Sequence, residues 1–146
     1  MLLHCLTYHD NARARSEVAK GLGGLIESYS RGMWGWQGWS RFRLVEEAAR
    51  TLVLALQDKD AWVRAWAAES LVDIQYREAL PLIVDLCKQP LENRAVADRA
   101  LHTLVENYRF FESSLYRGHS VWTEEDIALA DECIKSMRTA RAEGSE

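Results

Sequence analysis

Residues 29–43 gather side chains that often bind a partner. The segment YSRGMWGWQGWSRFR has three tryptophans, three arginines and three glycines, and no acidic residue. Its candidate partner-binding residues are Trp34, Trp36, Trp39, Arg41 and Arg43. Indole and guanidinium groups are common in protein interfaces, and they also bind single-stranded nucleic acid by stacking and phosphate pairing. Because glycines disfavour a continuous helix, a third interpretation is a loop that covers the open end of a helical core.

A second pair of tryptophans lies on a predicted helix. Trp62 and Trp66 are four residues apart, so they share one face of a helix over 61–75. The apolar stripe of this helix comprises Val63, Ala67, Leu71 and Ile74. The neighbouring stripe carries the candidate partner-binding residues Trp62, Trp66, Glu69 and Asp73. This stripe predicts a partner contact, and the alternative is that Trp66 packs against the next helix.

The other reactive side chains form no recognisable catalytic or metal site. His4, Cys5 and His9 are close in sequence, but a structural zinc site needs four ligands with paired spacing. The remaining cysteines and histidines, which are isolated in sequence, are Cys87, Cys133, His102 and His119. We expect a small buried cysteine, no metal, no cofactor and no catalytic residue. The glycines of 21–24 lack the lysine of a phosphate-binding loop and indicate either a close helix approach or an early helix end.

Length and composition describe the scaffold that must position these residues. The chain has 146 residues, 48% of them apolar, and a formal net charge of −4. We expect one folded domain with its own core and no membrane-spanning run. The three cysteines are an odd number, which argues against a disulfide framework, and the N-terminus lacks the features of a secretory signal. The expected location is the cytoplasm.

Helical periodicity dominates the chain. Apolar residues recur at three- and four-residue steps in the predicted helices 44–57, 61–75, 78–88, 92–108 and 124–141. Thr123 and Asp126 resemble a capping box at the start of the last helix. No segment shows the alternation typical of a strand.

The last part of the chain is predicted to cover the end of the helical core. Residues 107–122 look aromatic and irregular, and those expected to close the core are Phe110, Phe111, Leu115 and Tyr116. The helix over 124–141 presents an apolar face of Ile127, Ala130, Ile134 and Met137. Helical repeat proteins need such terminal elements to cover their final apolar face.

The sequence also repeats itself at the spacing of a helix pair. At an offset of 30 residues Arg64 aligns with Arg94, and at an offset of 49 residues Arg15 aligns with Arg64. Small residues and leucines align at the same two offsets, and the insertion 29–43 accounts for the larger one. Periods of this size indicate an α-solenoid.

The segment ALQDKDAWVRAWAAESLVDI resembles a HEAT repeat, of the short type also found in phycobilisome-lyase-like proteins. The similarity rests on an aspartate in the turn, Val63-Arg64 at the start of the second helix and the small pair Ala67-Ala68. In such repeats the turn aspartate and the arginine typically join neighbouring repeats in a polar ladder. The resemblance implies that this ladder is formed by one of the turn aspartates, Asp58 or Asp60, together with the repeat arginines Arg15, Arg64 and Arg94. In the third repeat Leu91-Glu92-Asn93 replaces the aspartate turn.

The resemblance implies an all-α fold, a short α-solenoid of about three HEAT-like helix pairs with a C-terminal capping helix. The expected single domain, 1–146, consists of an incomplete first repeat (1–28), the Trp/Gly/Arg insertion (29–43), two repeats (44–75 and 76–106) and a C-terminal cap (107–146). In HEAT-like solenoids the second helix of each pair lines the concave surface. The stripe of Trp62 would continue there through Arg13, Glu17, Lys20, Glu92, Val96, Arg99 and Thr103.

These features predict a non-catalytic protein-binding module, which acts as an adaptor, an assembly factor, or an inhibitor or immunity-like protein of a larger enzyme or complex. The alternative is a nucleic-acid-binding, DNA-repair-like protein that uses the Trp/Arg segment, and a third interpretation makes the tryptophan surface a homodimer interface. Family resemblance also admits an alkylpurine DNA glycosylase-like or a bilin lyase-like enzyme, which nothing in the sequence supports directly. The style of the fold favours a bacterial or phage origin.

Overall fold

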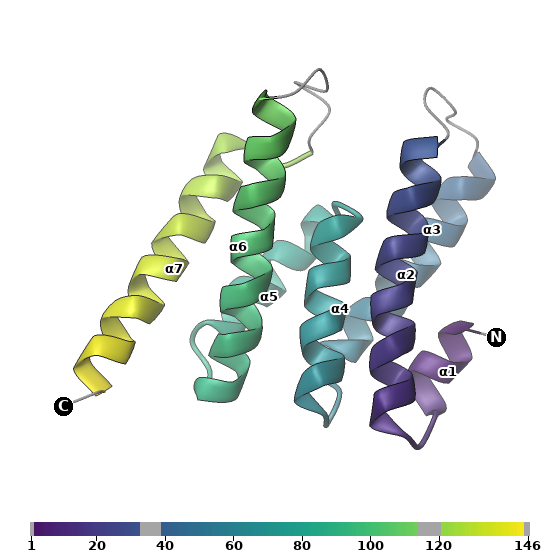
Figure 1. Cartoon of the computed structure of the whole chain (residues 1–146), viewed down its shortest axis with the longest axis horizontal. Helices are drawn as coiled ribbons and strands as arrows, with labels where there is room; N and C mark the ends of the chain where they lie inside the picture. The colour runs from purple at the N-terminus through teal and green to yellow at the C-terminus, as the bar shows by residue number, and fades with distance from the viewer. Residues whose placement is uncertain (1, 33–38, 114–120, 145–146) are drawn as a thin grey trace. The chain divides into compact units, whose positions relative to one another are not determined.

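The computed structural model describes residues 2–32, 39–113 and 121–144 of the chain (Figure 1). Its elements are α1 (Leu2–Tyr8), α2 (Ala12–Gly32), α3 (Trp39–Ala55), α4 (Ala61–Asp73), the short 3₁₀ helix η1 (Arg77–Ala79), α5 (Leu80–Leu86), α6 (Leu91–Ser113) and α7 (Glu124–Gly144). Within these residues there is no strand. The prediction of an all-α, solenoid-type fold of packed helices is therefore confirmed.

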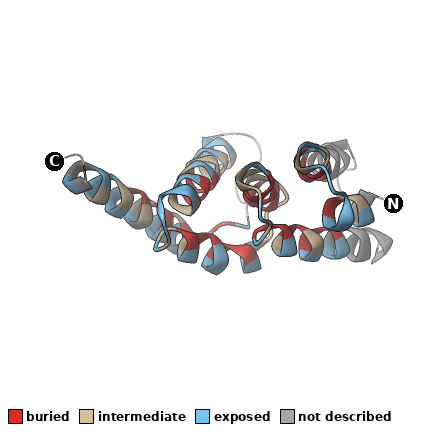
Figure 2. Cartoon of the chain, turned by 90° about the horizontal axis from the view of Figure 1, so that it is seen from below, coloured by how far each residue is buried: buried red, intermediate tan, exposed pale blue. Residues whose placement is uncertain are grey.

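The helices fall into two compact units, Met1–Tyr76 and Arg77–Glu146. The first unit holds α1 to α4, and the second holds η1 and α5 to α7. In both units, buried residues lie on the sides of the helices that face their neighbours (Figure 2). The prediction that the whole chain is a single domain stays a prediction.

The first unit consists of two stacked helix pairs. Helix α1 packs on α2 and α3 packs on α4, while α2 also packs on α4 and α1 on α3. The first helices of the pairs therefore form one layer and the second helices form the other. Its core is built from side chains of every helix, including Leu6, Leu22, Leu52, Val63 and Leu71.

Helix α4 packs against α2 and α3, and most of its residues are buried or half-buried. Three members of the predicted apolar stripe, Val63, Ala67 and Leu71, are fully buried, and Ile74 is half-buried. Asp60 is the N-cap of the helix, and its carboxylate accepts hydrogen bonds from the backbone N–H groups of Trp62 (2.9 Å) and Val63 (3.2 Å). Just past its C-terminus, Gln75 adopts a left-handed conformation with φ 58°, which is common where helices end.

The glycines of α2 do not end the helix, because α2 continues to Gly32. The expectation that glycines keep residues 29–43 out of a helix is also wrong at both ends, since α3 already begins at Trp39. Each glycine costs about 1 kcal/mol relative to alanine, and packing of α2 against α1, α3 and α4 outweighs this cost. Of the two interpretations of the glycine run, the close helix approach holds at one glycine, Gly23.

Small residues at the α2–α4 crossing explain why Gly23 is needed. A Cβ atom on Gly23 would lie 2.8 Å from the Cα of Ser70 and still closer to its side chain. Ser70 also donates a hydrogen bond from its hydroxyl to the backbone oxygen of Ala19 (2.6 Å). By contrast, a Cβ on Gly21 or Gly24 would meet nothing within 4 Å.

The second unit packs α6 against α5 and α7, and α5 also touches α7. The capping box is present at the start of α7. The Thr123 N–H donates to the Asp126 carboxylate (2.8 Å), and the Asp126 N–H donates to the Thr123 hydroxyl (3.2 Å). Arg77 donates two further hydrogen bonds to this carboxylate (3.1 and 3.2 Å). Burial favours a raised pKa for Asp126, but the hydrogen bonds from Thr123 and Arg77 hold its pKa below the ordinary value.

Several expectations for this unit are wrong. Residues 107–113 are helical rather than irregular, because α6 runs on to Ser113. Phe110 is 51% exposed and does not close the core, whereas Trp122 is buried. Leu115 and Tyr116 lie outside the described residues. Val96 was expected on the surface stripe but is buried, because it lies on the side of α6 that faces the core.

Candidate functional site

The candidate site is the outer face of α2 and α4 in the first unit. Two stripes of side chains, one on each helix, border a groove of about 450 Å³. The residues that line it are Glu17, Lys20, Gly21, Gly24, Trp66, Ser70 and Asp73. Because Gly21 and Gly24 have no side chains, the wall that α2 contributes to this groove is low. Because Gly23 lets α2 and α4 cross closely, the floor of the groove consists of backbone and Ser70.

The two tryptophans of α4 differ in their surroundings. Trp66 is half-buried, and the Lys20 ammonium lies 4.8 Å from the centroid of its ring, in a cation–π contact across the groove. Trp62, one turn earlier on the same stripe, is 63% exposed. Trp66 thus touches α2, which precedes α4 in the chain, while Trp62 leaves a large indole surface in contact with water.

The charges at this face are mixed. Glu17 and Asp73 share the groove lining with Lys20. Glu69, on the α4 stripe, is half-buried. This composition suits a protein surface with both apolar and charged groups, since aromatic residues with a polar rim are typical of protein interfaces.

A buried ion pair supports the same two helices from one end. Arg15 is 3% exposed and donates from two nitrogens to the carboxylate of Asp58, at 2.9 Å each. It also donates to the backbone oxygens of His9 (2.6 Å) and Asp10 (3.1 Å). This bidentate contact joins the start of α2 to the turn between α3 and α4.

Asp58 is the centre of this network. Its carboxylate accepts a hydrogen bond from the Asp60 N–H (2.9 Å), and its backbone oxygen accepts one from Arg64 (2.6 Å). Burial favours a raised pKa for Asp58, but the hydrogen bonds from Arg15 and the Asp60 N–H hold its pKa below the ordinary value. The hydrogen bond to Asp58 raises the pKa of Arg15. The structure therefore brings four of the five predicted ladder residues together.

Arg94 is separate from that network. It lies on α6 in the second unit and lines a groove between α6 and α7. Arg99 is exposed on α6. Of the Trp/Arg segment, Trp34 and Trp36 lie outside the described residues, and Trp39, Arg41 and Arg43 fall on the backbone of α3, with their side chains outside the description. The role of these residues in partner binding stays a prediction.

The reactive side chains have structural partners. Among the described residues, no group of three His, Cys, Asp or Glu side chains could hold a metal ion. His4 stacks on Tyr8, with ring centroids 4.8 Å apart, and the His9 ring accepts a hydrogen bond from the Asn11 N–H (3.1 Å).

The proximity of two cysteines, Cys87 and Cys133, was not predicted from the sequence. Cys87, at the C-terminal end of α5, interacts with Cys133 of α7, although 46 positions separate the two residues and they look isolated in the sequence. Burial first, and then the neighbouring Cys133 thiol, raise the pKa of Cys87 to about 12. The spacing of two cysteines on separate helices contains no sign of this proximity, which depends on how α7 packs.

Stacked helix pairs with an arginine–aspartate contact between successive turns define an α-helical repeat protein. A sequence model of the family described as HEAT repeats matches residues 1–104. Since this match covers well over half of the chain, the protein belongs to the HEAT repeat family, as the resemblance predicted. HEAT repeats are generally protein-interaction modules and are typically non-catalytic.

Two further results complete the comparison. A search of curated proteins gave no match for the chain. No helix among the described residues is long and apolar enough to cross a membrane.

Proposed function

We propose that the protein is a non-catalytic, cytoplasmic protein-binding module, which acts as an adaptor, an assembly factor or an inhibitor of a larger enzyme or complex. The observation that carries the proposal is Trp62, a 63% exposed indole on α4, a helix whose other sides are packed. Exposed aromatic residues on rigid elements are the side chains that most often dominate binding energy. The groove beside it, with Lys20 and Asp73, supplies the polar rim of such a surface.

The charges of the α2–α4 face favour a protein over a nucleic acid. Nucleic-acid affinity depends on several cations that contact phosphates, whereas this groove is lined by Glu17 and Asp73 as well as Lys20. The nucleic-acid alternative depends on the Trp/Arg segment and is tested as an outcome of the same experiment.

The test compares Trp62→Ala with Leu54→Ala, a matched control. Leu54 is an apolar residue of similar exposure, 66%, and it lies on α3 in the other helix layer. Each variant, checked for unchanged thermal unfolding, is used in affinity capture from the source cells, and captured proteins are identified by mass spectrometry. We expect a specific protein to be captured by the wild type and by Leu54→Ala, and to be lost with Trp62→Ala.

Other results of this experiment would contradict the proposal. Equal capture by Trp62→Ala would exclude the α2–α4 face as the binding surface. Nucleic acid that co-purifies and is released by added salt would support the nucleic-acid alternative, because phosphate contacts weaken steeply with salt. A dimer of the wild type that is lost with Trp62→Ala in light scattering would support self-association instead.

A further inference from the structure

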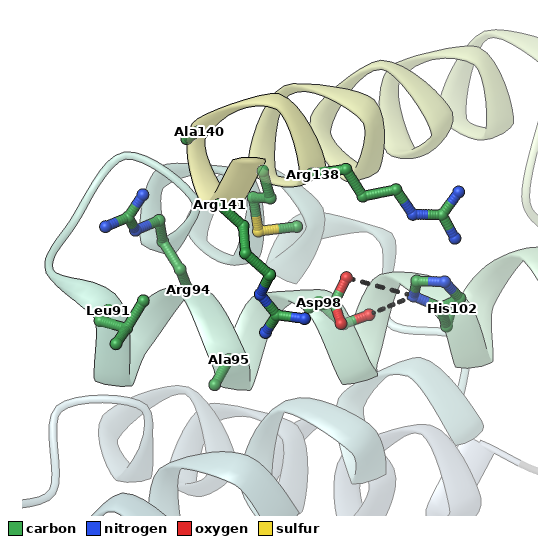
Figure 3. Close-up of a pocket in the computed structure, with 9 residues that line it drawn as sticks. Leu91, Arg94, Ala95, Asp98, His102, Arg138, Ala140 and Arg141 are labelled. Carbon is green, nitrogen blue, oxygen red and sulfur yellow. Dashed lines mark hydrogen bonds and ion pairs between the residues drawn. The ribbon is translucent and has the colours of Figure 1, made fainter. Parts of the chain in front are cut away.

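A second groove, of about 670 Å³, lies between α6 and α7 in the second unit (Figure 3). Its lining includes three arginines, Arg94 from α6 and Arg138 and Arg141 from α7. In Figure 3, Arg141 extends from α7 toward α6, where Asp98 and His102 border the same space. No part of the proposed protein-binding face on α2 and α4 contributes to it.

Positive charge exceeds negative charge among the residues that line this groove, with three arginines against one carboxylate, that of Asp98. None of the three arginines forms an ion pair with another described side chain. One acidic group, Asp98, also lines the groove; Nδ1 of His102 lies 2.8 Å from its backbone oxygen and 3.4 Å from a carboxylate oxygen. The Nε of Arg94 is buried and has no hydrogen-bond partner among the described residues. Among the described residues, Arg94 therefore has no counter-charge of the kind that Asp58 supplies to Arg15.

Apolar side chains line the same groove. Leu91 is 68% exposed at the start of α6, and Met137 faces the space from α7. A bare anion would leave these side chains in water. A ligand that carries both carboxylates and apolar groups would cover them and pair with the arginines as well.

The charge of the surroundings limits the length of such a ligand. Residues 77–146 contain nine Lys and Arg against thirteen Asp and Glu, a net charge of −4, so the arginine groove is a local exception. A long polyanion such as a nucleic acid would extend from the groove onto an acidic surface, including the exposed Glu124 and Glu125 of α7. A short segment confined to the groove avoids this repulsion.

We propose that the groove between α6 and α7 binds a short acidic and apolar peptide segment of a partner protein. The carboxylates of the peptide pair with Arg94, Arg138 and Arg141, and its apolar side chains pack on Leu91 and Met137. This binding site is separate from the α2–α4 face and does not depend on the function proposed for that face.

The test uses a random peptide display library that is selected on the full chain. Arg138→Gln/Arg141→Gln removes two exposed cations of the groove, and Arg109→Gln is the control, because Arg109 is an exposed arginine of α6 that does not line the groove. We expect selected peptides to be rich in Asp and Glu next to large apolar residues. Their affinity, measured by fluorescence polarisation, should fall about a hundredfold in the double variant, because a hydrogen bond to a charged group is worth about a factor of ten. It should be unchanged in Arg109→Gln and in Trp62→Ala.

Four results would overturn the proposal. The first is selection that yields only neutral or basic peptides, or none. The second is acidic peptides that bind the double variant as well as the wild type. The third is displacement of a selected peptide by inorganic phosphate at similar concentration, which would mean that the groove recognises an anion alone. The fourth is a short single-stranded DNA that binds the same arginines more tightly than any peptide.

Discussion

Alanine substitutions at two adjacent glycines should change stability in opposite directions. In an exposed helix interior, Gly→Ala stabilises by about 1 kcal/mol, and Gly24 fits this case because its new Cβ would meet nothing within 4 Å. At Gly23 the same gain is offset by overpacking against Ser70, which costs about 1–3 kcal/mol. Separation of the helices would also break the Ser70–Ala19 hydrogen bond, which contributes about 1 kcal/mol.

The net expectation is that Gly23→Ala destabilises the protein by about 2 kcal/mol, while Gly24→Ala stabilises it by about 1 kcal/mol. For a chain of this size, 1 kcal/mol shifts the unfolding temperature by about 2–4 °C. Gly23→Ala should therefore lower it by about 4–8 °C, and Gly24→Ala should raise it by about 2–4 °C. Thermal unfolding followed by far-ultraviolet circular dichroism measures both shifts.

Ser70→Ala separates the two contributions at the crossing, since it removes the hydrogen bond without adding volume. It should destabilise by about 1 kcal/mol. If Gly23→Ala raised the unfolding temperature as much as Gly24→Ala does, α2 and α4 could not cross as closely as the structure has them, and the account of the groove floor would be refuted.

Three further predictions follow from buried groups. Asp58→Asn should destabilise the protein by about 2–3 kcal/mol, because it leaves the buried Arg15 without its counter-charge. Urea unfolding measures this loss, and the control Lys59→Ala should change the urea midpoint little. Equal shifts of the midpoint in the two variants would contradict the prediction. Folding lowers the pKa values of Asp58 and Asp126, so the stability that these carboxylates contribute is present above the ordinary pKa of 3.8 and is lost as pH falls through their folded pKa values. At pH values below about 4, the unfolding temperature should therefore decrease. Asp126→Asn should make this decrease smaller. With a pKa of about 12, the Cys87 thiol should react with iodoacetamide at pH 8 on the order of a thousandfold more slowly than a free cysteine, and Cys133→Ala should accelerate it; peptide mass spectrometry measures both rates.

Local patterns in the sequence predicted which elements form and which residues share a face. The helical spacing of Val63, Ala67 and Leu71 gave the buried side of α4, and the pair Thr123 and Asp126 gave the start of α7. These features depend on residues three or four apart, so they can be recognised from one segment alone. The family resemblance likewise rested on local residues of one helix pair, and the HEAT repeat match supports it.

Helix ends and distant contacts were predicted less well, because they depend on packing between segments. Glycine propensity alone would have ended α2 early, but contacts with three neighbouring helices extend it to Gly32. The same reason applies to Phe110 and Trp122. Both are aromatic residues near the ends of helices, and packing between segments, which no local pattern contains, leaves Trp122 buried and Phe110 51% exposed.

Arg15 and Arg94 occupy equivalent positions in their repeats but have different chemical surroundings. The two residues align through Arg64 at the repeat offsets, so the sequence gives them one role. Arg15 faces a turn that holds Asp58, and its charge is compensated there at 2.9 Å. The sequence places Leu91-Glu92-Asn93 in the turn, but these residues are the first of α6; residues 87–90, which precede the helix, contain no aspartate, and Arg94 instead borders the space beside α7. Equivalent repeat positions therefore have different surroundings in the two units: Arg15 is held by a carboxylate, whereas Arg94 forms no ion pair with a described side chain and is one of the arginines assigned to the proposed peptide site.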